Sequence, residues 1–355
     1  MATSNPVWPG AADDLYESAM AAHGAGRHEE AVRLLGQASE AGHVLAMTLL
    51  GGQLLSGRGA PPDPPRGLRL IFQAADRGGG YACALAAAVI AAGVIGQPDW
   101  KAALDHLQRA AELGHVPAQE QLRILAAPTG PAPARAASWG ELRRAIDFDA
   151  WRVAPASRPL RTDPRIRVVD GFAPPAVCDW LIARARERLQ PAQVFDTSAF
   201  RPVRKETRTN SFAPFDIVGL DLVILLLRER LAASAGADAA TFEAPQVLHY
   251  AVGQQFAPHF DFLQPEVPGH LSSLKARGQR VATLLVYLNE GFEGGETDFP
   301  ALGLKYRGRT GDALMFWNVD AAGAPDERTL HAGLPPTSGE KWLLSQWVRD
   351  RPPQG

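Results

Sequence analysis

The sequence predicts two domains, a solenoid of helical repeats followed by a double-stranded β-helix, or jelly roll, with supporting helices. Three observations lead to this prediction. Small residues recur every 36 positions in the first third of the chain, a proline-rich stretch follows them, and short alternating segments separated by glycines fill most of the remainder. A chain of 355 residues is also longer than one compact domain usually is.

The repeats are expected over residues 12–125. Gly42, Gly78 and Gly114 lie 36 residues apart, and each follows a phrase typical of the last turn of a helix. Such a period, with small residues at fixed places, indicates stacked helix pairs. The segment resembles Sel-type, tetratricopeptide-like repeats, which implies a protein- or peptide-binding surface. A passive cap on the second domain is the alternative.

Residues 126–165 are expected to form a proline- and alanine-rich linker and a docking segment. Prolines at the density found over 126–137 break helices and are typical of linkers. A short helix is expected after Ser138, where it would connect the two domains.

The second domain is expected over residues 166–350. It should open with a strand at 166–172, followed by a helix that begins at Pro174 and a second helix over 217–232. Short strands with glycine turns then favour a double-sheet jelly roll, with the helices packed on one sheet. These strands are expected at 246–251, 257–262, 280–289, 295–299, 312–317, 328–333 and 341–349.

Two histidines and one aspartate have the pattern of a metal site. His259 and Asp261 are two residues apart on an expected strand, so both side chains point to the same face. His331 would come from another strand. Two imidazoles and one carboxylate leave three coordination positions open, as in non-haem Fe(II) oxygenases, whereas zinc sites more often contain cysteine or a third histidine.

Lys341 follows His331 by ten residues, within a run rich in apolar and aromatic side chains. A lysine buried there without a partner is costly. A bound anion explains it, namely the far carboxylate of 2-oxoglutarate, whose keto oxygen and C1 carboxylate can fill two of the open metal positions. O2 would take the third.

Residues 166–350 resemble the catalytic domain of prolyl 4-hydroxylases, within the 2-oxoglutarate/Fe(II) dioxygenases. The resemblance implies hydroxylation of an unactivated C–H, that of a prolyl residue of a protein or peptide, with succinate and CO2 as co-products. Its cofactors would be Fe(II), 2-oxoglutarate, O2 and ascorbate. The matching stretches are 246–250, 253–261, 280–289, 293–297, 311–317 and 331–341.

The resemblance also implies roles for single residues. Tyr250 and Thr283 would lie near the far carboxylate of 2-oxoglutarate, Trp347 would form a wall of the site, and Arg208 and Glu243 would contact the substrate. The alternatives are a core tyrosine or tryptophan, a strand-forming threonine and a surface arginine. The chain departs from the family at two positions, where Phe256 stands in place of a common tyrosine and Asn210 in place of a serine.

Composition excludes several other classes. A net charge of −2 gives no reason to expect nucleic acid or an anionic membrane as a partner. The only cysteines, Cys83 and Cys178, do not suggest a disulfide framework, so a reducing cytoplasm is expected. The first residues lack the pattern of a signal peptide, and the apolar run over 81–95 is too short to span a membrane.

Two other functions remain open. The enzyme would hydroxylate free proline or another small molecule, or the protein would be catalytically idle and act through its repeats. The complete set of His259, Asp261, His331 and Lys341 favours an enzyme. A zinc hydrolase is poorly supported because no general-base glutamate accompanies the ligands, and Asp261 argues against a halogenase, which needs that ligand position for chloride.

Overall fold

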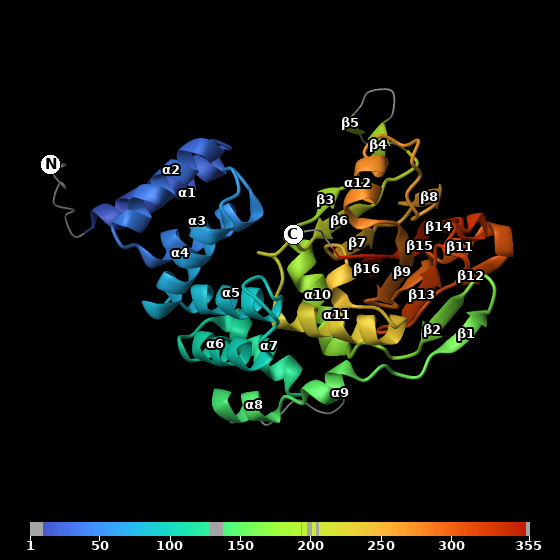
Figure 1. Ribbon diagram of the computed structural model, residues 1–355, viewed down its shortest axis with the longest axis horizontal. Helices are drawn as coiled ribbons and strands as arrows, with labels where there is room; N and C mark the ends of the chain where they lie inside the picture. Colours follow the sequence, from blue (N-terminus) through green and yellow to red (C-terminus); the bar gives the residue numbers. More distant parts are fainter. Residues whose placement is uncertain (1–9, 128–137, 193, 197–200, 204–205, 353–355) are drawn as a thin grey trace. The chain divides into compact units, whose positions relative to one another are not determined.

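The computed structural model in Figure 1 describes residues 10–127, 138–192, 194–196, 201–203 and 206–352. The chain divides into two compact units, of which the first contains residues 1–147 and 216–225 and the second contains 148–215 and 226–355. The division after residue 147 falls inside the segment expected as a linker. Its proline-rich part over 128–137 lies outside the described residues.

The first unit consists of antiparallel helices that follow one another along the chain. Consecutive helices pack as pairs, α1 on α2, α3 on α4 and α5 on α6. Gly42, Gly78 and Gly114 follow the ends of α2, α4 and α6 with φ values of 93°, 86° and 84°, a conformation that favours glycine. The predicted repeat is therefore confirmed. The helices are α1 (Ala11–Gly24), α2 (His28–Glu40), α3 (Val44–Ser56), α4 (Pro64–Asp76), α5 (Gly80–Ala91), α6 (Trp100–Glu112), α7 (Val116–Leu125) and α8 (Trp139–Ala145).

The first unit also contains a short segment that is distant in the sequence, residues 216–225. Ile217 and Val218 pack against the buried cluster of α4 and α5 that includes Ile71 and Leu85. The side-chain oxygen of Gln121 accepts a 3.1 Å hydrogen bond from the backbone of Leu222, the first residue of α11 (Leu222–Ala235). The sequence analysis had placed this segment in the second domain, which was expected over residues 166–350.

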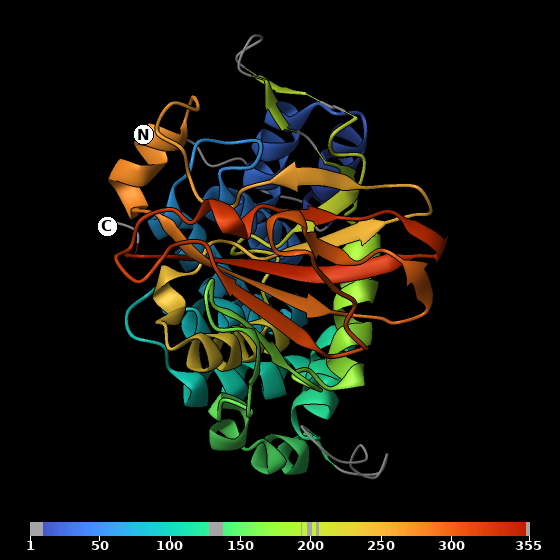
Figure 2. The ribbon, with the colours of Figure 1, turned by 90° about the vertical axis from the view of Figure 1, so that its right-hand side faces the viewer.

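Two antiparallel sheets form the framework of the second unit. The large sheet has the order β1-β2-β13-β9-β16-β7-β6-β3, and the small sheet has the order β12-β11-β14-β8. Figure 2 shows β16, the long red strand, crossing the large sheet with neighbours on both sides. The two sheets confirm the predicted jelly roll. The strands of the large sheet are β1 (Arg158–Arg161), β2 (Ile166–Val169), β3 (Gln190–Pro191), β6 (Ser211–Pro214), β7 (Gln246–Tyr250), β9 (Arg280–Tyr287), β13 (Ala313–Trp317) and β16 (Lys341–Arg349).

The small sheet faces an apolar core. Alternating residues of the large sheet, among them Leu285, Tyr287 and Leu343, pack with Phe299 of the small sheet in one buried cluster. This alternation follows from the two-residue period of a strand. The strands of the small sheet are β8 (Phe256–His259), β11 (Thr297–Phe299), β12 (Leu304–Tyr306) and β14 (His331–Gly333), and two further pairs are β10 (Phe292–Gly294) with β15 (Pro336–Gly339) and β4 (Val194–Asp196) with β5 (Arg201–Val203).

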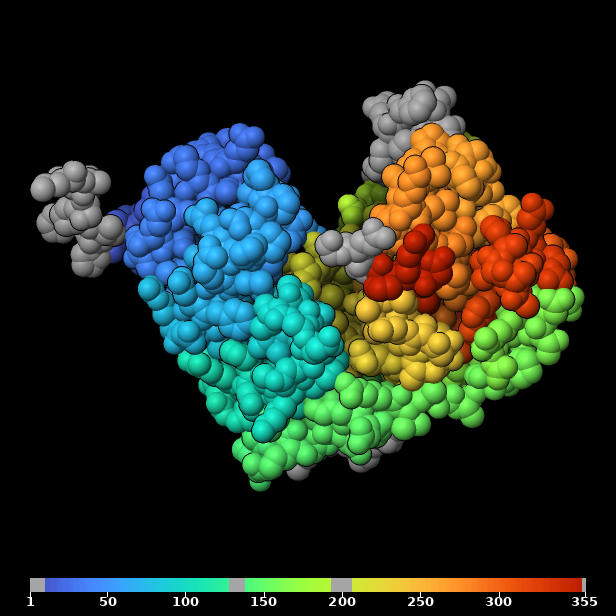
Figure 3. Space-filling view, viewed as in Figure 1, coloured from blue at the N-terminus to red at the C-terminus, as the bar shows by residue number. Residues whose placement is uncertain are grey.

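The helices of the second unit are α9 (Phe148–Arg152), α10 (Pro175–Arg186), most of α11, and α12 (His270–Arg277). Helix α10 packs on β6 and β7, as expected of a helix that covers a sheet. The segment that begins at His270 forms α12, which lies at the surface in orange in Figure 3.

Strand boundaries near the site also differ from expectation. β8 ends at His259, so Asp261 lies beyond the strand, and a 3-10 turn over Glu327–Thr329 precedes a shorter β14. Among the described residues, none of the helices combines the length and apolar character needed to cross a lipid bilayer.

Candidate metal centre and active site

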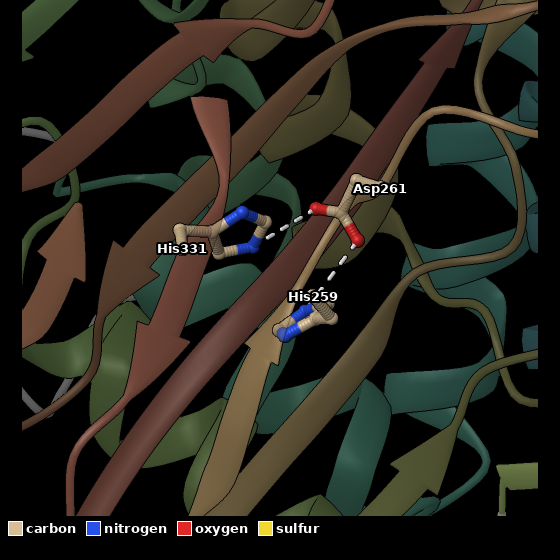
Figure 4. Close-up of side chains that lie close together, drawn as sticks. All are labelled: His259, Asp261 and His331. Atoms are coloured by element: carbon tan, nitrogen blue, oxygen red, sulfur yellow. Dashed lines mark ion pairs between the residues drawn. The ribbon is translucent and has the colours of Figure 1, made fainter. Parts of the chain in front are cut away.

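Three side chains converge between β8 and β14 (Figure 4). His259 and His331 face each other in register across these strands, and Asp261 follows two residues after His259. Nε2 of His331 lies 3.4 Å from Oδ2 of Asp261, and Nε2 of His259 lies 3.8 Å from Oδ1. One potential ligand atom from each residue lies within 4.8 Å of the others, so a single ion can contact all three.

A hydrogen bond at Nδ1 holds the ring of each of the two histidines. Nδ1 of His259 donates to the carbonyl of Ala257 at 2.9 Å, and Nδ1 of His331 donates to that of Thr329 at 3.0 Å. Each ring therefore keeps its Nε2 lone pair for a metal, because the proton resides on Nδ1.

Burial and charge set the protonation states that metal binding requires. Burial, with a further contribution from His331, lowers the pKa of His259 to about 3, so the imidazole is neutral at neutral pH. Burial alone would raise the pKa of Asp261, but interactions with His331 and His259 outweigh it and hold that pKa well below its usual range. A neutral imidazole and an ionised carboxylate are the forms that bind metal, and this donor set fits Fe(II).

Lys341 is fully buried beside the metal ligands, and its ammonium has no hydrogen-bond partner among the described residues. Its Nζ lies 5.1 Å from the ring centroid of Tyr250 and 5.7 Å from that of Tyr287. Burial lowers the pKa of Lys341 to about 7, although Glu296 opposes the shift. A carboxylate bound at this nitrogen would supply the missing partner, so the site fits the far end of 2-oxoglutarate.

The metal ligands and Lys341 line the same cavity. Its volume is about 30 Å³. The lining residues are Arg208, Leu248, Tyr250, Phe256, His259, Asp261, Leu285, Thr297, His331, Ala332, Gly333, Lys341, Leu343, Ser345 and Trp347.

Three residues expected at the site line this cavity, namely Tyr250, Trp347 and Arg208. Tyr250 pairs with Lys341 across β7 and β16, and burial raises the pKa of its phenol to about 12. Nε of Arg208 donates to Oδ1 of Asn210 at 3.3 Å. Burial lowers the pKa of Arg208, because the guanidinium is largely removed from water.

Thr283 requires a correction, because the structure does not place it near Lys341. The register of β9 and β16 sets Thr283 opposite Trp347, four positions before Tyr287. Its hydroxyl donates to Oδ2 of Asp261 at 2.7 Å and accepts from Asn318 at 3.0 Å. Thr283 therefore holds the carboxylate of Asp261 in place, and its contact with the far carboxylate of 2-oxoglutarate is not supported.

Glu243 lies between two arginines, and its expected contact with the substrate stays a prediction. Arg280 binds its carboxylate in a bidentate pair, at 2.7 and 3.0 Å, and Arg349 contacts it at 2.6 Å. Glu243 is absent from the cavity lining. The guanidinium of Arg280 lies 3.8 Å from the ring centroid of Trp347, which does line the cavity. Glu243 is thus linked to the cavity through Arg280 and Trp347.

Sequence reasoning did not single out Thr297, and it assigned Phe256 no contact within the site. The hydroxyl of Thr297 lies 2.8 Å from that of Tyr287, within the wall that also contains Lys341. Thr297 belongs to the matching stretch 293–297, so alternation along that stretch could have indicated its inward direction. Phe256 was noted only for its missing hydroxyl, whereas its ring stacks on His259 with centroids 3.5 Å apart.

Comparisons with known proteins agree with this site. The model of the 2OG-Fe(II) oxygenase superfamily matches residues 245–349. Prolyl 4-hydroxylase 1 of Arabidopsis thaliana is 35% identical over 202 residues, which cover 53% of this chain and 70% of that protein. Further curated relatives from the same plant carry prolyl 4-hydroxylase names, at 30–33% identity.

Two solved structures match different parts of the chain. The viral collagen prolyl hydroxylase of Paramecium Bursaria Chlorella virus-1, solved with 2OG, has 32% identity and a TM-score of 0.40, over 52% of this chain and 95% of that one. A Sel1 repeat protein from Oxalobacter formigenes has 22% identity and a TM-score of 0.32, over 40% of this chain and 61% of that one.

Proposed function

The chain belongs to the prolyl 4-hydroxylase family of 2-oxoglutarate/Fe(II) dioxygenases, and we propose that it hydroxylates a prolyl residue of a protein or peptide. The observation that supports this proposal best is the shared cavity of the three metal ligands and an unpartnered, buried Lys341. A structural metal site alone would leave that ammonium without a reason to be buried.

In the proposed reaction the residues of this chain bind and orient the reactants. His259, Asp261 and His331 would hold Fe(II) on one face, and Lys341 would bind the far carboxylate of 2-oxoglutarate. Iron, 2-oxoglutarate and O2 together would supply the oxidant for a C–H bond, with succinate and CO2 as co-products. The apolar walls formed by Leu285 and Leu343 would exclude water from this oxidant.

Arg208 is the residue proposed to bind the substrate. It lines the cavity, and its planar guanidinium can donate several hydrogen bonds to a peptide carbonyl or to a carboxylate. Free proline, the alternative substrate, would place its carboxylate on the same group. Turnover assays with proline-rich peptides that have blocked ends and with free proline therefore distinguish the two substrates. Only free proline would bind Arg208 through a full negative charge.

The helical repeats are the proposed partner-binding region. A groove of about 560 Å³ in the first unit is lined by residues of α1, α2, α3 and α5, by the loop after α3 and by Val218, with Met20 and Leu49 among its apolar residues. Gln53 also lines the groove, and its buried side-chain oxygen has no hydrogen-bond partner among the described residues. The groove contains no acidic lining residue, so it would tolerate carboxylates on that peptide.

Two further elements complete the proposal. Ascorbate would sustain turnover by keeping the iron ferrous. The reducing cytoplasm is the proposed compartment, and the structure is compatible with it because both Cys83 and Cys178 are buried free thiols.

Anaerobic titration with Fe(II) and then 2-oxoglutarate tests the proposed site. Chelation of the iron by 2-oxoglutarate should produce a visible metal-to-ligand charge-transfer band in the natural protein. His259→Ala should lose the band and 2-oxoglutarate turnover while keeping its circular dichroism spectrum. A variant that retained turnover would remove His259 from the iron site. A folded natural protein without any band would favour an idle protein that acts through its repeats.

A further inference from the structure

Three side chains that line the cavity, those of Arg208, Phe256 and His259, are stacked in a column. The guanidinium of Arg208 lies 4.3 Å from the ring centroid of Phe256. The ring of Phe256 lies face to face with the imidazole of His259, with centroids 3.5 Å apart and planes inclined by 13°. One phenyl ring therefore contacts both the group proposed for substrate and a group proposed for iron.

A bulge in β8 explains why Phe256 and His259 share a face. Residues three apart on a regular strand point to opposite sides of the sheet. Here His259 pairs with His331 and Phe256 pairs with Gly333, so three steps along β8 correspond to two along β14. The extra residue turns Phe256 onto the side of His259, as bulges beside active sites do.

Backbone pairing places Arg208 on the other side of the same ring. Arg208 forms an antiparallel bridge with Phe256. The backbone N–H of Ala257 donates to the carbonyl of Thr207 at 2.7 Å, and that of Thr209 donates to Gln255 at 2.9 Å. Residues directly opposite each other in an antiparallel pair project side by side. The backbone pairing of Arg208 with Phe256 and the bulge in β8 therefore account for the stacked column.

Few other contacts hold the two ends of the column. Among the described residues, the imidazole of His259 has, besides its Nδ1 hydrogen bond, a tilted contact with His331, with centroids 4.3 Å apart, and the 3.8 Å approach of its Nε2 to Asp261. Arg208 has the 3.3 Å hydrogen bond from its Nε to Asn210, and a more distant contact of 5.8 Å with the ring of Phe212. Loss of the Phe256 ring would leave both groups freer to rotate.

We propose that Phe256 is a positioning residue that couples the metal ligand His259 to the substrate arm Thr207–Thr209. A metal bound at His259 fixes the imidazole plane, the imidazole fixes the phenyl ring, and the ring fixes Arg208 over the cavity. Coupling between two sites is reciprocal, so order in the arm also strengthens metal binding. This inference rests on the proposed iron site, and it adds a role for Phe256 that does not require a hydroxyl group.

The test compares Phe256→Leu, which removes the aromatic ring, with Phe256→Tyr, which keeps it. Phe260→Leu is the matched control, because Phe260 lies in the same segment and stacks on Phe262, with centroids 4.6 Å apart. Mn(II), followed by electron paramagnetic resonance, serves as an oxygen-stable probe of the metal site. Phe256→Leu should lower the affinity for Mn(II) about tenfold, as changes to residues that support ligands do. The other two variants should bind as the natural protein does.

Hydrogen exchange then measures the coupling itself. In the natural protein, Mn(II) should slow exchange in a peptide that covers Thr207–Ser211, because the N–H of Thr209 donates to the carbonyl of Gln255, the residue before β8. Phe256→Leu should abolish this metal-dependent protection, and Phe256→Tyr should restore it. Equal Mn(II) affinity and equal protection in all variants would overturn the role of Phe256. Failure of the natural protein to bind Mn(II) would instead overturn the proposed metal site, so the two failures are distinguishable.

Discussion

Replacement of Lys341 by methionine should stabilise the metal-free protein while it removes 2-oxoglutarate binding. Methionine fills a similar volume without a charge. Burial lowers the pKa of Lys341 from 10.5 to about 7, and at 1.36 kcal/mol per unit this corresponds to a cost of ~4 kcal/mol at neutral pH. This value is an upper limit, because local rearrangement and water reduce the cost of a buried charge.

The pH dependence gives the sign of the effect. The pKa of Lys341 is lower in the folded than in the unfolded chain, so the unfolded chain binds more protons between about pH 7 and 10.5. The natural protein therefore gains stability as pH rises through this window. Lys341→Met cannot titrate there, so its advantage should be largest at and below pH 7 and should shrink towards pH 10.

Hydrogen exchange of the β9 and β16 amides provides the assay, because it reports opening of the second unit separately from the first. Lys305→Met, at an exposed lysine on β12, serves as the control and should change little. Saturating 2-oxoglutarate at 100 times its Kd should stabilise the natural protein by about 2.7 kcal/mol and leave Lys341→Met unaffected. A variant less stable than the natural protein at every pH would refute the reasoning.

Three further predictions concern the same cavity. The affinity for 2-oxoglutarate should be constant below about pH 7 and then fall about tenfold per pH unit, because Lys341 must take up a proton to bind the carboxylate; calorimetry that showed a flat profile to pH 9 would contradict this. Thr283→Val should weaken metal binding by about tenfold or more through loss of the hydrogen bond to Asp261, whereas Thr283→Ser should preserve it; equal Mn(II) affinities in both variants would count against this role. Glu243→Gln should destabilise the second unit by about 3 kcal/mol, because Arg280 would lose its charged partner in a half-buried site; an unchanged unfolding free energy would show that solvent compensates.

The metal ligands could be predicted from sequence because their chemistry is local and specific. The spacing of His259 and Asp261 and the later His331 allow few other interpretations once strands are expected around them. The jelly roll could be predicted for a similar reason, since alternation and glycine turns are properties of short segments. The unpartnered Lys341 could be inferred because a buried cation in an apolar strand requires an explanation.

The environments of Thr283 and Glu243 could not be predicted, because they depend on partners from distant segments. The hydroxyl of Thr283 meets Asp261 across 22 residues of sequence, and Glu243 meets Arg349 across 106. The stacking of Phe256 on His259 also escaped prediction. A regular strand would separate these residues to opposite faces, and a bulge has no distinct pattern in a single sequence.

The segment over 216–225 bears on how such a protein can be divided or recombined. A protein fragment that ends at residue 165 would lack Ile217 and Val218, which pack on the buried cluster of Ile71 and Leu85. The isolated catalytic sequence would then carry uncovered apolar side chains, while the isolated repeats would leave the amide oxygen of Gln121 without its donor at Leu222. Because residues 216–225 belong to the first unit, a division of the chain at the proline-rich stretch would split that unit.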